Sequence, residues 1–486
     1  MLAANHSRPS VTPSLPPWWL EEALAAEGAR DDLRSVGEGP GARLEGERRV
    51  DVAIVGGGYT GLWTALALRE REPSASVAVL EAEVCGWGPS GRNGGFLNGY
   101  WTHLHRLRAT FGDGDSVEIA RTAARVIPAV RAFCETRGAD VWLREGGYLK
   151  VSAAPAQDTA VERSIATARE LGVEEEAVPL SPDQVAERCL SPVFRRGVFF
   201  PDGATVQPAR LARALRRAVL ADGIELHERT RVTRLRSGRP SVLETPRGRV
   251  VADEVVVATN AHTTGLPPLG SRLTNFGSYV VLTEPVPDLL REIRWTGGEA
   301  VTDGRMFIHY FRTTSDGRVL MGSGSGPIGH GGRVDDRFSR DAPTAARAER
   351  GLRRLLPSLA DARVERTWGG PIDVSADHFP FFGTLAGTHV HYGVGYSGHG
   401  VGPSWLGGQI LASLALDRDD EWRAHPLVRV PRASLPPEPL KRLGGGVIRA
   451  AILAVEAAEE DGRRAALPVR AVAGLPRLLR MPLGTR

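Results

Sequence analysis

The first clear hydrophobic pattern in the chain is a strand-like run at residues 50–55, Val-Asp-Val-Ala-Ile-Val, which leads into a glycine-rich turn. Apolar positions with helical spacing follow over 61–70, and a second short apolar run covers 77–80 and ends on Glu81. A strand, a turn, a helix and a strand of these lengths form the crossover that joins two parallel strands. The pattern therefore predicts an α/β unit that begins near residue 50.

Helix and strand patterns continue to alternate along the rest of the chain. The periodicity predicts strands at 147–152, 224–227, 232–235, 249–258, 278–282 and 318–322. It predicts helices at 208–220, 344–356, 406–416 and 440–459. From about residue 263 to 364 the patterns are mostly those of strands, so we expect a separate β-rich domain there.

The composition is that of an ordinary globular protein with more than one domain. The chain has 486 residues, of which 42% are hydrophobic and 24% are charged, whereas single hydrophobic cores stop growing at about 250 to 300 residues. The net charge of +4 arises from basic residues that are mixed with acidic ones throughout the chain. Because no basic stripe or nucleic-acid-binding motif accompanies them, we do not expect the protein to bind nucleic acid.

Cysteine usage and hydropathy indicate the compartment. Cys85, Cys134 and Cys189 are an odd number of cysteines at unrelated spacings, which does not suggest a disulfide framework. The N-terminus lacks the basic and then apolar regions of a signal peptide, and no stretch reaches the roughly 18 apolar residues of a membrane span. We therefore expect a soluble, cytoplasmic protein without a membrane span.

The glycine-rich turn that follows the first strand carries the strongest chemical signal. Gly56 permits a tight turn, Gly58 allows backbone amides to approach a diphosphate, and Gly61 lets the helix pack on the strand. Glu81 follows 20 residues after Gly61 at the end of the second strand, where a carboxylate binds ribose hydroxyls. The turn therefore predicts a site for an unphosphorylated dinucleotide, although it does not separate FAD from NAD.

A second glycine-rich segment, residues 393–400, directly precedes the predicted helix at 406–416. The first amides of a helix have no partner within the helix and attract negative charge. Such a helix end is suited to a reduced flavin, which is negative at N1 and at the C2 oxygen. Taken alone, however, the segment is better interpreted as a simple loop that enters a helix.

The sequence resembles the D-amino-acid-oxidase-like FAD-dependent oxidoreductases, and within them the gamma-glutamylputrescine oxidase and aminophosphonate oxidoreductase branch. Eight motifs carry this resemblance in the family's order, and they are residues 51–68, 90–95, 202–206, 258–261, 310–318, 368–373, 380–383 and 395–400. Together they span about residues 18 to 440. The resemblance implies bound FAD, and an amine or amino acid as the substrate.

The resemblance also implies the domain organisation and most of the cofactor-binding residues. It implies a Rossmann-like FAD-binding domain of glutathione-reductase type at 49–103, 195–262 and 365–420, and a β-rich substrate domain at 104–194 and 263–364. An N-terminal arm at 1–48 and a C-terminal linker and helix at 421–486 complete the chain. The predicted cofactor-binding residues are Gly56, Gly58, Tyr59, Thr60, Gly61, Glu81, Ala82, Ser90, Gly91, Arg92, Asn93, Gly94, Gly95, Val232, Ala258, Thr259, Asn260, Gly370, Gly395, Tyr396, Ser397, Gly398, Gly400 and Val401.

Three positions depart from the sarcosine-oxidase pattern within this family. Gly370 stands where that pattern has a cysteine that tethers the flavin, so we expect non-covalent FAD. Gly402 and Leu320 stand where it has lysines that hold substrate carboxylate and activate oxygen. Sarcosine is thus not the expected substrate, and the electron acceptor, dioxygen or another molecule, stays open.

The candidate catalytic residues are Tyr310, Arg312 and His399. Tyr310 and Arg312 are two apart on a predicted strand and so share a face. Arg312 offers a planar fork for a carboxylate or phosphonate, while Tyr310 orients the amine. The alternative for both is a structural role or exposure to solvent. His399 either stabilises the flavin edge and moves protons, or only caps the helix.

The expected reaction is transfer of a hydride from the carbon that bears the amine to flavin N5, which leaves an imine that water hydrolyses to an aldehyde or keto product. No metal is predicted, because His309, His378, His389 and His391 lack carboxylate or thiolate partners at ligand spacing. The alternatives that use the same dinucleotide fingerprint are an FAD monooxygenase, an NAD-dependent dehydrogenase and a non-catalytic dinucleotide-binding protein.

Overall fold

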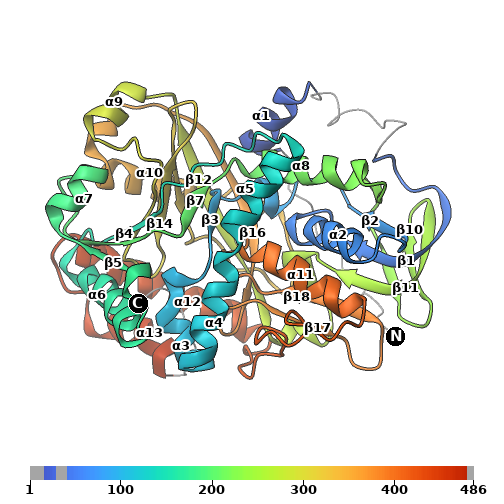
Figure 1. Ribbon diagram of the computed structural model, residues 1–486. Helices are drawn as coiled ribbons and strands as arrows, with labels where there is room; N and C mark the ends of the chain where they lie inside the picture. The colour runs from blue at the N-terminus through green and yellow to red at the C-terminus, as the bar shows by residue number, and fades with distance from the viewer. Residues whose placement is uncertain (1–15, 29–40, 479–486) are drawn as a thin grey trace.

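The computed structural model describes residues 16–28 and 41–478, and its strands form two eight-stranded sheets and one two-stranded sheet. Figure 1 shows the two large sheets side by side, with β1, β2 and β11 in one half of the molecule and β12, β14 and β4 in the other. The fold is mixed α/β, as predicted. Most of the predicted N-terminal arm, at 1–15 and 29–40, lies outside the described residues.

The first sheet carries the predicted crossover. Its strands run in the order β17-β18-β11-β1-β2-β8, and β9 and β10 extend β11 as a hairpin. Their bounds are β1 (Gly46–Val55), β2 (Val77–Leu80), β8 (Glu225–His227), β9 (Arg234–Arg236), β10 (Ser241–Thr245), β11 (Gly248–Val257), β17 (Phe381–Thr384) and β18 (Val390–Val394). β1 is parallel to β2 and β11, and β11 is parallel to β18. The carboxyl ends of these strands therefore meet along one edge, which is where open α/β sheets bind ligands.

Three helices pack on this sheet. They are α2 (Tyr59–Arg71), α8 (Pro208–Ala221) and α11 (Pro403–Ala415). α11 lies against α2 although the two are more than 300 residues apart in sequence, and Figure 1 shows them side by side. Gly408 allows this approach, since a Cβ on it would lie 2.6 Å from Cβ of Trp63. The core of this half is thus closed only by the last strand-turn-helix unit.

The second sheet is mostly antiparallel and runs in the order β16-β12-β15-β14-β13-β4-β6-β5. Its strands are β4 (Tyr148–Val151), β5 (Val178–Leu180), β6 (Gly197–Phe200), β12 (Leu273–Thr283), β13 (Ala300–Asp303), β14 (His309–Thr313), β15 (Val319–Ser323) and β16 (Val364–Ser375). β6 and β16 thus lie in this sheet, whereas the predicted boundaries assign 195–262 and 365–420 to the FAD-binding domain. The division of the chain between the two sheets therefore differs from the predicted domain boundaries. β16 belongs to the second sheet because it pairs with β12 along its length.

Helices and a small sheet cover the second sheet and connect the two halves. The helices are α3 (Leu104–Phe111), α4 (Asp113–Ala124), α5 (Val126–Arg137), α6 (Asp158–Glu170), α7 (Pro182–Arg188), α9 (Pro287–Glu292) and α10 (Ala342–Leu355). β3 (Phe96–Asn98) and β7 (Gly203–Thr205) form the two-stranded sheet. In Figure 1, α3, α4 and α5 run through the middle of the molecule between its two halves.

The described parts of the terminal regions dock on these halves. α1 (Trp18–Ala26) packs on α8, where Gln207 Nε2 donates to the Trp19 carbonyl at 2.7 Å. α12 (Leu440–Glu460) is held to the second half by an ion pair between Arg305 and Glu456 at 3.0 Å, and it precedes α13 (Leu467–Leu478). Among the described residues, no helix is both long and apolar enough to cross a membrane.

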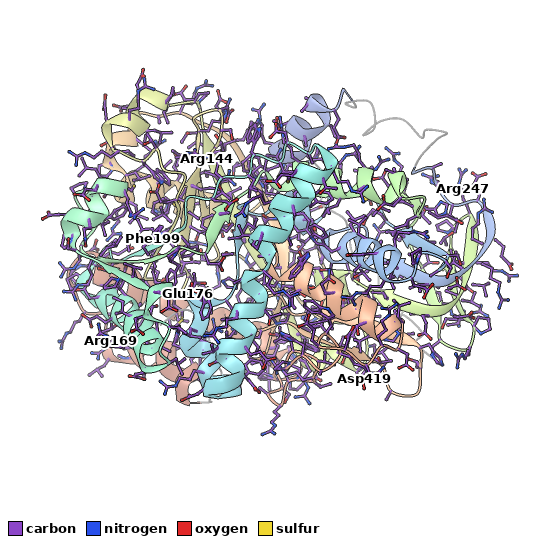
Figure 2. The ribbon with its side chains drawn as sticks, viewed as in Figure 1. Arg144, Arg169, Glu176, Phe199, Arg247 and Asp419 are labelled. Atoms are coloured by element: carbon purple, nitrogen blue, oxygen red, sulfur yellow. The ribbon has the colours of Figure 1, made fainter. Side chains whose placement is uncertain are left out.

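Basic side chains are distributed over both halves. Figure 2 shows Arg169 on α6 and Arg247 in the turn between β10 and β11 at opposite ends of the molecule. Arg247 pairs with Glu45 at 2.8 Å and Arg249 pairs with Glu47, so cations of the first sheet have acidic neighbours. This distribution agrees with the mixed charge pattern of the sequence.

Candidate active site

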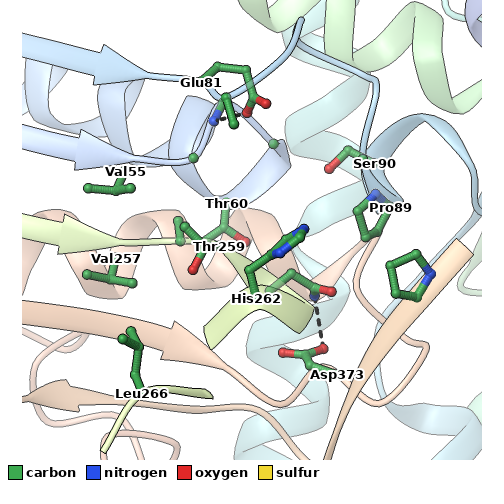
Figure 3. Close-up of a pocket in the computed structure, with 18 of the residues that line it drawn as sticks. Val55, Thr60, Glu81, Pro89, Ser90, Val257, Thr259, His262, Leu266 and Asp373 are labelled. Atoms are coloured by element: carbon green, nitrogen blue, oxygen red, sulfur yellow. Dashed lines mark hydrogen bonds between the residues drawn. The ribbon is translucent and has the colours of Figure 1, made fainter. Parts of the chain in front are cut away.

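A cavity of about 820 Å³ runs along the carboxyl ends of β1, β2 and β11. Figure 3 shows Val55, Glu81 and Val257 at these strand ends, with Pro89 and Ser90 on a loop at the opposite side. The predicted cofactor-binding residues that line the cavity are Gly56, Gly58, Tyr59, Thr60, Glu81, Ala82, Ser90, Asn93, Val232, Ala258, Thr259, Asn260, Tyr396, Gly398, Gly400 and Val401. The other predicted cofactor-binding residues do not line it, and they are Gly61, Gly91, Arg92, Gly94, Gly95, Gly370, Gly395 and Ser397.

The glycine-rich turn between β1 and α2 leaves no room for side chains. Gly56 has a φ of +112°, and a Cβ on it would lie 2.5 Å from the Ala258 carbonyl oxygen. A Cβ on Gly61 would lie 1.9 Å from the Gly56 carbonyl oxygen. These contacts bring the N-terminus of α2 to the cavity wall, where its amides and positive end suit a diphosphate.

Glu81 stands at the end of β2 with its carboxylate turned toward the turn. It accepts hydrogen bonds from the Gly57 amide at 2.7 Å and from the Glu83 amide at 2.9 Å, and the first of these is drawn in Figure 3. Burial raises the pKa of Glu81 to about 7, while these amides oppose the shift. Each carboxylate oxygen has a second acceptor site, so the group retains capacity for ribose hydroxyls.

The loop at 90–95 is bonded to the rest of the site through its polar groups. Ser90 Oγ accepts from the Tyr59 amide at 2.9 Å, which ties the loop to the first turn of α2. Asn93 Nδ2 donates to the Pro89 carbonyl at 3.0 Å, and its carbonyl accepts from Trp19 Nε1 at 3.0 Å. Buried Arg92 donates to the carbonyls of Trp87 and Gly369. Helix α1 and strand β16 therefore both fix the loop in place.

Asp373 at the far end of the cavity was assigned no function from the sequence. Its carboxylate accepts from Asn260 Nδ2 at 2.9 Å, as Figure 3 shows, and from the Gly395 amide. Burial raises its pKa to about 6, and hydrogen bonds from backbone amides counteract part of that rise. Asp373 thus joins the end of β11 to the turn after β18. Asp373 ends the motif at 368–373, which is a signal in the sequence, but no local pattern reveals these partners.

The second glycine-rich segment forms the turn from β18 into α11. Gly398, Gly400 and Val401 line the cavity, and Pro403 occupies the first turn of α11. Tyr396 Oη, from this segment, accepts from Thr60 Oγ1 at 2.8 Å. The first turn of α2 is therefore joined to the second glycine-rich segment at the wall of one cavity.

Tyr310 and Arg312 share a face of β14 and pack against the loop at 90–95. Tyr310 Oη is 2.8 Å from Ser278 Oγ, and the ring would be 2.9 Å from a Cβ on Gly94. Arg312 is fully buried, and its guanidinium donates to the carbonyls of Thr313, Val206 and Gly95. These contacts are those of a structural arginine, which was the alternative to a substrate-binding role for Arg312. Its role toward a substrate stays a prediction.

His399 lies between two residues of the cavity wall, Gly398 and Gly400, and is half-buried. Its ring packs edge-on against His103 with ring centroids 4.0 Å apart. Burial, together with the charge of Arg106, lowers the pKa of His399 to about 4, so the ring is neutral near pH 7. Its predicted catalytic role also stays a prediction.

A separate group of ionisable side chains lies on the second sheet. Asp303, His309 and Glu460 place ligand-type atoms within 4.8 Å of one another. His309 Nδ1 is 2.7 Å from Asp303, and Glu460 pairs with Arg305 at 2.8 Å and with Arg354 at 3.2 Å. The two arginines make this group an ion-pair network that holds α12 on the sheet.

The cavity fits an FAD molecule by its volume and by its chemistry. Its volume falls within the range of about 300 to 1,000 Å³ found for ligand pockets, and its lining includes both Val232 and the second glycine turn at Gly398, Gly400 and Val401. Asn260 Oδ1 is buried at the cavity without a hydrogen-bond partner among the described residues. A ligand with hydroxyl or amide donors would satisfy that oxygen.

Known proteins with similar sequences and structures agree with this assignment. The family model for FAD dependent oxidoreductases (DAO) matches residues 51–414. Gamma-glutamylputrescine oxidoreductase of Escherichia coli (strain K12) is 29% identical over 411 residues, which cover 84% of this chain and 91% of that protein.

Solved structures give the same fold. The crystal structure of glycine oxidase from Geobacillus kaustophilus has a TM-score of 0.66 and 23% identity, and covers 79% of this chain and 100% of its own. That of L-proline dehydrogenase from P. horikoshii has a TM-score of 0.63 and 20% identity, and covers 78% of this chain and 96% of its own.

Proposed function

The chain belongs to the FAD dependent oxidoreductase (DAO) family, and we propose that it oxidises a primary or secondary amine to an imine. The observation that carries the proposal is the single cavity that joins the dinucleotide turn at Gly56–Gly58 to the second glycine turn at Gly398–Val401. The three similar proteins described above are named for gamma-glutamylputrescine, glycine and L-proline, all of which carry an amine.

Residues of both halves would hold the cofactor. The amides at the N-terminus of α2 and Ser90 surround the diphosphate position, Glu81 faces the ribose, and Val232 marks the adenine end. The N-terminus of α11 lies at the opposite end, where its positive pole favours negative charge. Bound FAD supplies the acceptor for the hydride that leaves the carbon next to the amine nitrogen.

The protein's own contribution is positioning and exclusion of water. Tyr310 from β14 and the loop at 90–95 close one side of the site, and both are fixed by hydrogen bonds and ring packing. A rigid, buried site holds the substrate C–H in one orientation and keeps the amine in its neutral, reactive form, because burial disfavours the ammonium ion. Water then hydrolyses the released imine to an aldehyde or keto product.

The flavin is proposed to be bound without a covalent tether. Gly370, on β16, has no side chain with which to form a bond, and Cβ of the neighbouring Arg92 lies 3.3 Å from where its Cβ would be. Denaturation of the purified protein in acid should release all of its FAD into solution. Flavin that stays with the precipitated chain would contradict this part of the proposal.

The electron acceptor is proposed to be either dioxygen or another small molecule. Leu320 stands at the position where the sarcosine-oxidase pattern has an oxygen-activating lysine. It is fully buried in an apolar cluster with Trp19 and Trp368. Stopped-flow reoxidation of the reduced protein by air, compared with an artificial quinone, would decide between them. A cytoplasmic location is proposed on the free state of Cys85, Cys134 and Cys189.

Anaerobic titration tests the activity itself. The purified protein should show flavin absorption that is bleached by at least one member of a panel of amino acids, polyamines and aminophosphonates. Bleaching by NADPH, with no response to any amine, would overturn the proposal in favour of a monooxygenase.

A further inference from the structure

Helix α12 has an apolar face that no other described part of the chain covers. Its buried residues lie on the side toward the second sheet, and they are Ala451, Ile452, Glu456 and Ala458. The outer side carries six exposed apolar residues, here called the α12 stripe, and they are Leu440, Leu443, Val447, Ala450, Ala454 and Ala457. Leu440 and Leu443 are each 64% exposed. Because contiguous exposed apolar surface marks sites of interaction, the α12 stripe indicates a contact surface.

The spacing of the α12 stripe is that of a helix pair. Its residues follow one another at steps of three, four, three, four and three positions, which is the repeat of about 3.5 residues that forms the seam of a coiled coil. The attachment of α12 to its own chain uses the other face, where Arg305 pairs with Glu456 at 3.0 Å. The α12 stripe is thus suited to a second helix.

Two glycines beside the α12 stripe indicate that this second helix comes close. Gly444 and Gly446 stand inside α12, where glycine disfavours the helix. A Cβ on either of them would meet no described atom within 4 Å, whereas a Cβ on Gly445 would lie 2.8 Å from Cδ1 of Ile328. Packing within the chain therefore accounts for Gly445 but not for the two glycines that flank it. Their missing side chains leave room for another backbone.

The charges along α12 select the direction of the second helix. The helix begins with Lys441 and Arg442 and ends with Glu459 and Glu460, which Asp461 follows. This order is the reverse of the one that the helix macrodipole favours. An antiparallel helix of the same sequence would place its acidic end beside this basic end, and the two macrodipoles would oppose each other. A parallel helix would instead bring like charges together.

We propose that α12 pairs antiparallel with α12 of a second copy of this chain. The two-fold axis passes at Ala450, so both helices present the same α12 stripe to each other. Leu443 then lies opposite Ala457 of the partner subunit, and Val447 lies opposite Ala454 of the partner subunit. Large side chains thus meet small ones along the seam, as close packing requires. The 21 residues of α12 make this seam about 30 Å long.

The α12 stripe lies outside the cofactor cavity, but α12 is bonded to the segment that forms part of its wall. Arg449 Nε donates to the Ser325 carbonyl at 2.7 Å, and Glu438, just before α12, accepts from the amide of Gly331, which lines the cavity. α12 also follows the residues that the family model matches, 51–414, so membership of the family does not account for the stripe. The pairing therefore goes beyond the proposed oxidation, and it would hold in place a helix that supports the cavity wall.

Sedimentation velocity of the FAD-loaded full chain tests the pairing over a range of concentrations. Wild type should be a dimer. Ala450→Glu places two carboxylates at the axis and should raise the dissociation constant of the dimer by at least about 100-fold, and Leu443→Glu should also separate the subunits. The matched control Ala109→Glu, at an exposed position of α3, should stay dimeric.

Bound FAD, measured by its absorption, shows in the same samples that each variant is folded. A wild type that is monomeric at every concentration would overturn the inference. A dimer that neither Ala450→Glu nor Leu443→Glu dissociates would overturn it as well.

Disulfide cross-linking tests the antiparallel arrangement. In a Cys134→Ser background, where Cys85 and Cys189 are buried, Ala450→Cys alone should join two subunits on mild oxidation, because a disulfide forms only between Cα atoms within about 7 Å. Leu443→Cys alone should not cross-link, but co-expressed Leu443→Cys and Ala457→Cys chains should. Cross-linking of Leu443→Cys alone would mean a parallel pair and would overturn the inference.

Two other occupants of the α12 stripe would give different results. A monomer that floats with vesicles of phosphatidylglycerol and phosphatidylcholine, and no longer does so in Leu443→Glu, would assign the stripe to a membrane surface. A monomer that dimerises only after deletion of residues 479–486 would assign it to the end of the chain itself. Either result would overturn the inference and leave the proposed amine oxidation as it stands.

Discussion

Arg312 and Arg106 are both more than nine-tenths buried, yet their guanidinium groups meet different surroundings. Arg312 donates to three backbone carbonyls and lies over the Trp19 ring. Arg106 has an aromatic ring and three histidines around it, and its Nη2 has no partner among the described residues. Burial lowers the pKa of Arg312 to about 9 and that of Arg106 to about 10. Nη2 of Arg312 is also buried without a partner among the described residues, so the two arginines differ in the carbonyls that Arg312 bonds and not in having an unpaired nitrogen.

Position in the sequence did not distinguish the two arginines. Arg312 stands on a strand beside Tyr310 and was the predicted anion-binding group, whereas Arg106 follows His103 in an ordinary-looking amphipathic helix. The bonded carbonyls, and not burial, mark Arg312 as a structural arginine.

The largest expected effect on stability is that of a substitution at Trp19. This residue belongs to α1, and its ring lies under the guanidinium of Arg312. Trp19→Ala removes a fully buried indole that packs on Trp368 and bonds the Asn93 carbonyl. It should lower the free energy of unfolding by about 3 to 5 kcal/mol and weaken FAD binding. Urea unfolding and FAD titration measure the two effects. Trp18→Ala, on a half-buried neighbour, should cost clearly less, and an equal loss would show that Trp19 has no special place.

Arg312→Met should be nearly as damaging to stability. It leaves the buried carbonyl of Val206 without this donor, while the Gly95 carbonyl keeps the Val206 amide, and an unsatisfied buried group costs about 1 to 3 kcal/mol. We expect a loss of up to about 3 kcal/mol in urea unfolding, with an unchanged rate of flavin reduction by the amine found in the anaerobic titration. If the variant is as stable as wild type but its flavin is reduced more slowly, Arg312 serves the substrate and not the fold.

Arg106→Gln should change stability by less than about 1 kcal/mol, or raise it, because removing a buried charge relieves a desolvation cost and Asp377, which interacts with Arg106, keeps its pair with Arg429. Thermal unfolding of the FAD-loaded variant measures this. Arg363→Gln, at an exposed site, gives the baseline. A loss as large as that in Arg312→Met would mean that Arg106 is a structural group.

The smallest expected effect is a pH dependence from Lys150. Burial, together with the charges of Arg106 and Arg163, lowers its pKa to about 8, so the side chain loses its proton as pH rises through about 8. His399, with a pKa near 4, stays neutral over this range. The unfolded chain keeps the Lys150 proton to a higher pH, so the free energy of unfolding in urea should rise by up to about 1 kcal/mol between about pH 8 and 9. The rise should be absent in Lys150→Met, and a wild type without it would show that folding does not lower the pKa of Lys150.

Local pattern predicted much of the fold. The strand at 77–80 has the predicted bounds, and α8, α10 and α12 begin and end within two residues of prediction. β1 begins earlier, at Gly46, because its charged start pairs with Gly248–Val251 of β11 while the side chains stay exposed. A hydrophobic pattern does not reveal such an exposed extension.

The candidate site, like the fold, could be predicted from the sequence only in part. The glycine fingerprint could be interpreted because the steric need for Gly56 and Gly61 arises within one turn. The partners of Asp373 and the group around Arg106 could not, because His103, Lys150, His378 and His399 come from distant elements and no spacing in sequence connects them. The sequence also did not show that β16 pairs with β12 in the second sheet while it brings Asp373 to the cavity.

The hydrogen bond from Thr60 to Tyr396 spans 336 residues of chain, and this has a consequence for synthesis on the ribosome. The strand β1 and the glycine turn emerge early, but β18 and α11, which complete both the sheet and the cavity, emerge last among its elements. A nascent chain therefore exposes the edge of β11 at Val255–Val257 until β18, which ends at Val394, has left the exit tunnel. Only a finished chain can then bind FAD tightly. Chains truncated before β18 should be bound by chaperones or degraded by proteases.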